Sequence, residues 1–394
     1  MTALTWDTHP DHTWLRGQAP DHPVEYDEHH EYWKVFGHAE ALEVLGDPGR
    51  FSSDLSRISP EFASELDDGS LIRVDPPEHR KLRTIVNHAF TPKTVDDLAP
   101  RIDALATELL DAVTTGSWDL VTELAYPLPA IVIAELLGVP ASDRELFREW
   151  ANAMVESTME PPTNEAEATE TRDEFETLMA KWRPMLDYLR EHAVQRRHSP
   201  RDDLLTHLVE AEVDGERLTD QQVVNFANVL LFAGHISTTM LLGNTVLCLD
   251  AFPEQLAKVR ADRSLVPAAL EESLRFLTPF AETMRVTTTE VELGGRAIPP
   301  GRLVRLWLAA ANRDERVFDR PHQFDVGRNP NPHIGFGRGI HFCLGAPLAR
   351  LEGRIVLNLL LDRFAELRTD PANPPAFVSS PDFTGVRTLP VLTR

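Results

Sequence analysis

The sequence predicts a mainly α-helical protein with a small β region, arranged as one domain over residues 1–394. Long stretches with apolar residues at helical spacing support the helical part, and the longest runs from Thr219 to about Asp250. The β part rests on short alternating runs separated by Pro and Gly turns, at residues 283–288, 290–293 and 303–306. The chain contains neither an internal repeat nor a linker that would separate independent domains.

The other predicted elements follow in order along the chain. Residues 1–30 are rich in His, Asp and Pro and form an irregular N-terminal arm. A strand-like piece at 33–36 and a helix at 39–45 come next, and the polar residues 51–72 form a long loop. An acidic, proline-broken segment at 159–167 is a candidate mobile flap. Further helices are predicted at residues 75–90, 94–114, 121–137, 142–157, 167–197 and 347–364.

The longest predicted helix has clear signals at both ends. Thr219 and, three residues later, Gln222 form a capping box, and Phe252-Pro253 ends the helix. Thirty residues at ~1.5 Å each reach about 45 Å, so the helix crosses a whole domain and must be buried on nearly all sides. Residues 229–249 come nearest to a membrane span, but they carry too many polar groups for a helix that faces lipid. These groups are His235, Ser237, Thr238, Thr239, Asn244 and Thr245.

Composition excludes several classes of partner. The formal net charge of −23 would repel nucleic acid and anionic membranes, so we expect neither. Two cysteines cannot form a disulfide framework, and the first residues lack the pattern of a signal peptide, so we expect a cytoplasmic protein. The arm holds several histidines without the ligand spacing of a zinc site, which favours a solvated segment. They are His9, His12, His22, His29 and His30.

The strongest chemical signal is the ten-residue segment Phe-Gly-Arg-Gly-Ile-His-Phe-Cys-Leu-Gly that begins at Phe336. Its thiol, Cys343, can form a thiolate, which is a soft, electron-rich ligand for iron. Gly337 and Gly345 allow the backbone to curl and to approach a flat partner closely. Phe336 could shield the sulfur, and His341 could meet an acidic group.

Two simpler interpretations fit this segment less well. A lone Cys is most often a small buried hydrophobe, which suits Cys248 in its apolar helical run but not Cys343 among six matched neighbours. The glycines at 335, 337 and 339 do not follow a buried strand, as a dinucleotide-binding turn requires. The segment resembles the haem-ligand loop of the cytochrome P-450 family, Phe-Gly-x-Gly-x-His-x-Cys-x-Gly, at every fixed position.

The resemblance implies a cytochrome P-450 fold, with haem b between the long central helix and the Cys-loop helix and with Cys343 as the axial ligand of the iron. By family position, four cations would hold the haem propionates: His79, Arg83, Arg285 and His341. The remaining haem contacts would come from Phe336, Gly337, Gly345 and Ala233. A structural triad without a catalytic role would comprise Glu272, Arg275 and Arg328, the first two on one helix face.

The central helix departs from the family pattern Ala/Gly-Gly-x-Asp/Glu-Thr. Here the stretch that begins at Ala233 reads Ala-Gly-His-Ile-Ser-Thr-Thr, so Ile236 replaces the carboxylate and Ser237 the threonine. A serine hydroxyl can still donate a proton, an isoleucine cannot, and His235 would have to turn inward to do so. We therefore expect water or a substrate hydroxyl to share the relay. The candidate catalytic residues are Gly234, His235, Ile236, Ser237 and Thr238.

The activity that the resemblance implies is a monooxygenase reaction that uses O₂ and two electrons from NAD(P)H. Because the chain contains no fused flavin or iron–sulfur segment, a separate ferredoxin and ferredoxin reductase would deliver the electrons. Basic residues that could form a ferredoxin patch are Lys81, Arg338, Arg350 and Arg354. The alternatives are a peroxide-driven oxidation or oxidative coupling, a haem-catalysed isomerisation or dehydration, and a haem sensor without oxygenase activity.

The expected substrate is a bulky, mostly apolar small molecule, such as a polyketide or macrolide to be hydroxylated or epoxidised. Family position places the pocket at residues 56–72, 154–159, 230–237, 278–284 and 383–384. The pocket residues singled out are Leu230, Phe280, Ala281, Glu282 and Phe383. For Glu282, a surface-facing carboxylate is favoured over a partner for a cationic substrate group.

Overall fold

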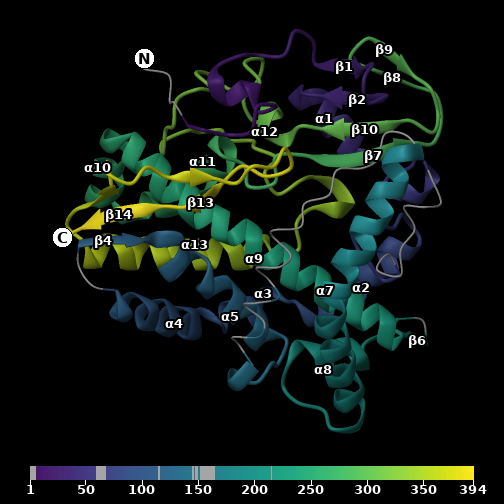
Figure 1. Ribbon diagram of the computed structural model, residues 1–394, viewed down its shortest axis with the longest axis horizontal. Coiled ribbons are helices and arrows are strands. Elements are labelled where there is room, and N and C mark those ends of the chain that lie inside the picture. The colour runs from purple at the N-terminus through teal and green to yellow at the C-terminus, as the bar shows by residue number, and fades with distance from the viewer. Residues whose placement is uncertain are drawn as a thin grey trace.

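The chain folds into a mainly helical body with small sheets along its edges, as the sequence predicts (Figure 1). The five-stranded sheet lies along the upper edge of the view, and β4 and β14 lie side by side at the left. The computed structural model describes residues 6–58, 68–113, 116–143, 146, 150, 165–213 and 215–394. The pocket segment predicted at 154–159, most of the flap and most of the helix at 142–157 lie outside these residues.

The helices account for most of the predicted helical stretches. In the N-terminal half they are α1 (His38–Gly46), α2 (Glu78–Ala89), α3 (Pro92–Asp96), α4 (Ala99–Ala112), α5 (Pro127–Leu136) and α7 (Glu165–His198). In the C-terminal half they are α8 (Leu204–Glu210), α9 (Asp220–Ala251), α10 (Pro253–Ala261), α11 (Val266–Phe276), α12 (Leu308–Ala311) and α13 (Ala346–Arg363).

Prolines divide two stretches that the sequence predicted as single helices. The stretch 94–114 forms α3 and α4, and Pro100 occupies the first turn of α4. The stretch 121–137 forms a π-helical turn at Val121–Ala125 and then α5, which begins at Pro127. Proline lacks an N–H and clashes with the preceding turn, so it starts a helix more readily than it continues one.

The largest sheet joins strands from both ends of the chain in the order β1-β2-β10-β7-β3. Its strands are β1 (Val24–Asp27), β2 (Tyr32–Val35), β10 (Leu303–Leu306), β7 (Thr283–Thr287) and β3 (Phe51–Ser52). β2 and β10 pair in parallel, and the other neighbours are antiparallel. A second sheet has the order β11-β14-β4, from Leu367–Thr369, Pro390–Thr393 and Gly116–Asp119. The two-stranded pairs are β5 (Glu212–Val213) with β6 (Glu216–Arg217), β8 (Val291–Leu293) with β9 (Arg296–Ile298), and β12 (Ala376–Phe377) with β13 (Val386–Thr388).

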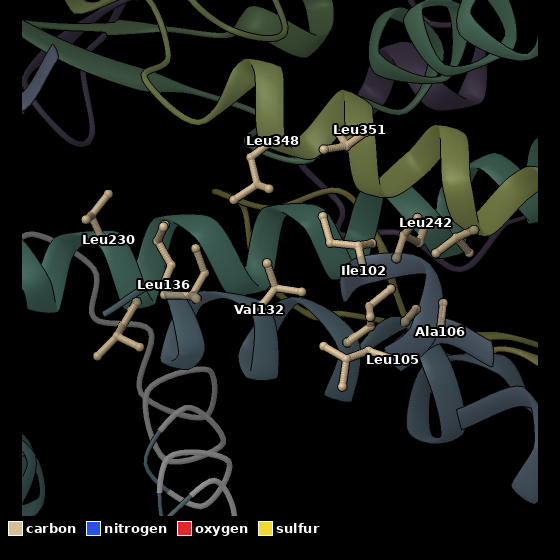
Figure 2. Packing of buried hydrophobic residues seen from close by; sticks show 14 of the residues in the cluster. Ile102, Leu105, Ala106, Val132, Leu136, Leu230, Leu242, Leu348 and Leu351 are labelled. Carbon is tan, nitrogen blue, oxygen red and sulfur yellow. The ribbon is translucent and has the colours of Figure 1, made fainter. Parts of the chain in front are cut away.

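Helix α9 runs through the centre of the main hydrophobic core. The predicted capping box is present, with the Thr219 side chain accepting from the N–H of Gln222, and the helix ends at the C-cap Phe252. Figure 2 shows Leu242 of α9 near Ile102 of α4, and Leu351 of α13 lies above them in this view. α9 is the one described helix long and apolar enough to cross a membrane, and 67% of its apolar window is buried in the protein.

The N-terminal arm is more ordered than the sequence suggested. It contains β1, and His12 and Trp14 are each only 1% exposed, so the expectation of a solvated segment is wrong for these two residues. The rings of Trp14 and Trp307 lie 5.2 Å apart, and this apolar contact fixes the arm against the sheet. No group of three potential metal ligands occurs among the described residues.

Candidate functional site

The Cys343 loop is a tight turn that requires glycine. The N–H of Cys343 donates to the carbonyl of Phe336 over 2.9 Å and closes the loop. Gly337 and Gly339 adopt φ angles of +70° and +71°, a region that other residues rarely enter. A Cβ on Gly339 would lie 2.4 Å from the carbonyl oxygen of Leu45, so a side chain would collide with the backbone of α1.

The sulfur of Cys343 lies at the beginning of α13, where backbone donors meet it. The N–H groups of Gly345 and Ala346 donate to the sulfur. Burial raises the pKa of the Cys343 thiol, whereas these two bonds and the charges of Arg83 and Arg350 lower it. Amide donors and nearby cations favour the thiolate, which is the form that ligates a metal.

The four cations predicted to hold propionates gather above the same loop. The rings of His79 and His341 lie 4.3 Å apart, and Ser53 Oγ lies 2.9 Å from His341 Nε2. Burial lowers the pKa of His341 to about 3, that of Arg285 to about 10, and that of Arg83 below its usual value. The charged Arg83 and Arg285 thus lie together with two neutral histidine rings in a place that solvates charge poorly.

This crowding fits an anionic cofactor. Nε2 of His79 is buried without a hydrogen-bond partner among the described residues. Within the part of the chain that the structure describes, neither Arg83 nor Arg285 forms an ion pair. The nearby Asp75 nevertheless raises the pKa of Arg285. Buried cations and orphaned polar atoms are costly unless a ligand pairs with them. Two carboxylates of a haem would supply the missing partners, so the residues present fit that group.

The predicted triad is assembled and almost completely buried. Arg275 is 0% exposed and donates from both Nε and Nη2 to Glu272, at 2.8 and 2.7 Å. Nε of Arg328 reaches the same carboxylate at 3.1 and 3.2 Å. The remaining Arg275 donors bond to the carbonyls of Asn312, Pro321 and Gln323. The triad ties α11 to the chain that leads into the Cys343 loop.

The predicted catalytic residues on α9 point in different directions. The ring of His235 packs on Tyr126 at 4.2 Å, and its Nε2 lies 3.0 Å from the Tyr126 carbonyl. Burial lowers the pKa of His235 to about 4, so the ring is neutral. A Cβ on Gly234 would lie 2.8 Å from Ile133 of α5, so this glycine allows close helix packing. The sequence left open that His235 turns inward to donate a proton. In the structure the ring faces Tyr126 instead, so this possibility is wrong.

A cavity of about 320 Å³ lies against α9 and the strand β7. Ile236 and Phe383 line it, and both pack in an apolar cluster with Met240. Of the five predicted pocket residues, Phe280, Glu282 and Phe383 line the cavity. Leu230 packs into the main core instead, and Ala281 packs with Trp14 and Trp307. Lining residues that sequence reasoning did not single out include Ile72, Arg73, Trp182, Val378 and Asp382.

Glu282 corrects a sequence-based expectation. The residue is 8% exposed and lines the cavity, so the favoured surface-facing position is wrong. Its Oε2 accepts from Nε of Arg305 over 2.6 Å. Arg305 was not predicted as a site residue, because its neighbours in β10 carry no motif.

The predicted ferredoxin patch is only partly free. Arg350 donates to both carboxylate oxygens of Glu271 at 2.7 and 2.8 Å and stacks on the Phe336 ring at 4.5 Å. Lys81 pairs with Glu216. Arg338 and Arg354 are exposed, and Phe342 within the loop is 39% exposed.

The fold and this site together define a haem-thiolate protein. A cysteine at the beginning of a helix, a buried cation cluster and an apolar cavity beside the central helix fit haem better than another cofactor. The chain belongs to the cytochrome P450 family, whose model matches residues 12–384, and it is accordingly a monooxygenase.

Similar proteins are bacterial tailoring enzymes. The chain is 43% identical to the cyclomarin C epoxidase CymV of Salinispora arenicola, over 97% of this chain and 96% of that protein. It is 42% identical to the erythromycin C-12 hydroxylase of Saccharopolyspora erythraea, over 96% and 93%. Among solved structures, the hydroxylase HmtN, involved in himastatin biosynthesis, shares 54% identity at a TM-score of 0.88, with 99% of this chain and 98% of that chain covered.

Proposed function

We propose that this enzyme hydroxylates or epoxidises a bulky, mostly apolar secondary metabolite in the cytoplasm, with electrons passed from NAD(P)H by a ferredoxin reductase and a ferredoxin. The cavity between α9 and β7 carries this proposal, because its lining is mainly apolar with a few polar groups. The names of the relatives support the substrate class, since CymV is a cyclomarin C epoxidase and another relative hydroxylates erythromycin.

In this proposal, each group of residues has one task toward the cofactor. Cys343 would ligate the iron, and His79, Arg83, Arg285 and His341 would hold the propionates. A bound haem with a thiolate ligand supplies the oxidising chemistry that inserts oxygen into unreactive C–H or C=C bonds. The cavity binds and orients the substrate and excludes bulk water.

Ser237 would hold a proton close to the reacting centre. Its hydroxyl donates to the Ala233 carbonyl over 2.6 Å, which leaves its lone pairs as acceptors. Ile236, in the position of the family's carboxylate, lines the cavity and can relay nothing. Water or a substrate hydroxyl would therefore supply the next proton donor.

Ile236 also supports a second candidate function, a peroxide-driven oxidation or an oxidative coupling that depends less on proton relay. A reconstituted assay separates the two. The first candidate requires O₂, NADPH, ferredoxin and reductase for turnover, whereas a peroxide-driven enzyme would turn over with hydrogen peroxide alone.

The substrate is best found by a library screen that follows the Soret band of the ferric protein. Displacement of water from the iron moves this band from its low-spin to its high-spin position. The CO-bound reduced spectrum tests the thiolate directly. A band at the position of imidazole-ligated haems, in place of the red-shifted band of a thiolate-ligated haem, would contradict Cys343 as the ligand.

A further inference from the structure

Two carboxyl groups, Glu282 and Asp382, lie together in the wall of the cavity and share one arginine. Nε of Arg305 donates to Glu282 over 2.6 Å, and its Nη2 donates to Asp382 over 2.5 Å. Both acids line the cavity, and their side chains are 5% and 28% exposed. One end of an otherwise mainly apolar pocket is therefore acidic.

The charges in this wall do not balance. Arg305 provides one positive charge for two carboxylates, and its other contacts are the hydroxyl of Tyr32 at 3.4 Å and the ring of Trp307 at 4.9 Å. An uncompensated negative charge is costly beside an apolar cavity. Either a bound proton or a positive group of the ligand must compensate it.

Among the described residues, two arginines line the cavity itself, and both are poor candidates for this task. Arg285 is 7% exposed and belongs to the cluster that fits the propionates, and its Nη1 donates to the Met284 carbonyl over 2.6 Å. Arg73 is exposed, so solvent screens its charge. In the empty cavity, the charge balance of the acidic wall therefore requires a proton on one of the two acids.

The two acids are held in place before a ligand arrives. The N–H of Ala281 donates to the Asp382 carbonyl over 2.8 Å, and the N–H of Asp382 donates to Ser380 Oγ over 3.2 Å. On the outer side, Nε2 of His12 lies 2.8 Å from the Pro381 carbonyl. A recognition site on fixed backbone binds without the entropic cost of ordering it.

We propose that the cavity accepts a substrate with a protonated aliphatic nitrogen, and that Glu282 and Asp382 recognise this ammonium group beside Arg305. The inference rests on the proposed function, in which the same cavity holds the substrate. It makes Glu282 and Asp382 determinants of specificity, whereas Cys343 and Ser237 serve the reaction common to the family.

The protonation of Glu282 agrees with this arrangement. Burial raises the pKa of Glu282 to about 8, Arg305 opposes the rise, and Asp382 adds to it. At pH 7 the empty site therefore holds a proton on Glu282. When the ammonium binds, this proton leaves for solvent, so one positive charge replaces another.

Binding of matched alkyl probes to the haem-loaded protein tests the proposal. The probes are dodecyltrimethylammonium, 1-dodecanol and dodecanoate. Their binding is measured by calorimetry and by the shift of the Soret band. The quaternary ammonium cannot coordinate iron, so its shift reports occupation of the cavity. We expect the cation to bind at least about tenfold more tightly than the alcohol, as for a close, partly buried charge pair.

Two variants and one control localise the effect. Glu282→Gln and Asp382→Asn should each weaken the binding of the cation about tenfold, if each loses a charge worth ~1.4 kcal/mol. The affinity for dodecanol should stay unchanged. Glu40→Gln, which removes a carboxylate that pairs with Arg316 outside the cavity, should change neither. Gln and Asn retain an oxygen that accepts from Arg305, and a normal CO-bound spectrum shows that each variant is folded.

Wild-type protein provides a further test that needs no variant. Calorimetry in buffers of different ionisation enthalpy at pH 7 should detect proton release with dodecyltrimethylammonium and none with dodecanol. Equal affinities for cation and alcohol, or tightest binding of dodecanoate, would overturn the inference while leaving the cavity as a substrate site. Binding of none of the probes would overturn the substrate cavity itself, and this inference with it.

Discussion

The Ser237 hydroxyl donates to the carbonyl oxygen of Ala233, one helical turn earlier in α9, over 2.6 Å. The neighbouring Ile236 is 4% exposed and belongs to an apolar cluster with Met240 and Phe383. Ser237 is thus a hydroxyl beside an apolar lining, at the position where the sequence predicts a proton donor. His235 cannot share this task, because its ring faces Tyr126.

Ser237→Ala should uncouple electron use from product formation. Without the hydroxyl, protons reach the reacting centre less reliably, so we expect more hydrogen peroxide and less product per NADPH, with product formation falling about a hundredfold if general acid catalysis loses its smallest usual contribution. The measurement is the ratio of product to NADPH consumed. An unchanged ratio would show that Ser237 takes no part.

Thr245→Val is the matched control for this experiment. Thr245 also donates to the carbonyl four residues earlier, Leu241, over 2.7 Å, and it is 2% exposed on the same helix. It lies about two helical turns beyond Ser237, away from the cavity-lining Ile236 that neighbours Ser237. Its loss should leave the coupling ratio unchanged, and uncoupling in both variants would indicate a general distortion of α9.

Glu272→Gln should strongly destabilise the protein. The Glu272 carboxylate is 0% exposed and accepts from Arg275, Arg328 and the N–H of Asp325 at 2.9 Å. Removing one member of a buried charge network leaves the other charges unpaired and typically costs about 3–5 kcal/mol. Urea unfolding measures this loss. Glu212→Gln, at the exposed pair with Arg217, should cost less than about 1 kcal/mol.

Motifs that are continuous or closely spaced in the chain were predictable from the sequence. The Cys343 loop and the Glu272–Arg275 pair fall into this class, since their partners lie within a few residues. The Arg305–Asp382 contact spans 77 residues and depends on how β10 meets the C-terminal loop, which periodicity does not encode. Strands such as β12, with two residues, are too short for an alternating pattern to be detected.

Arg285→Gln should release haem faster if Arg285 holds a propionate. A charge-assisted bond contributes about 1.5–3 kcal/mol, so its loss should accelerate haem transfer to apomyoglobin by about tenfold or more. Arg302→Gln, an exposed cation on the chain that leads into the same sheet, is the control. Equal transfer rates for wild type and Arg285→Gln would contradict the propionate role.

Glu352→Gln should change how stability depends on pH. Glu352 lies on α13, is 0% exposed, and neither of its carboxylate oxygens has a hydrogen-bond partner among the described residues. Burial alone raises the pKa of Glu352 to about 8 from 4.5. The folded protein therefore holds this proton more tightly than the unfolded chain, and the group's stabilising contribution, complete below pH 4.5, is lost as the pH rises to 8.

Glutamine cannot ionise, so the variant should lose less stability than the wild type between pH 5.5 and 8. The expected difference in slope is up to about 1.4 kcal/mol per pH unit, the value for one proton. Urea unfolding of the haem-loaded proteins at several pH values measures it. Comparison with wild type cancels the contribution of Glu282, which has a raised pKa in the same range. Glu108→Gln, which removes an exposed carboxylate on α4, is the control and should leave the slope unchanged. If the slope for Glu352→Gln equals that of wild type, the buried carboxyl does not ionise in this pH range.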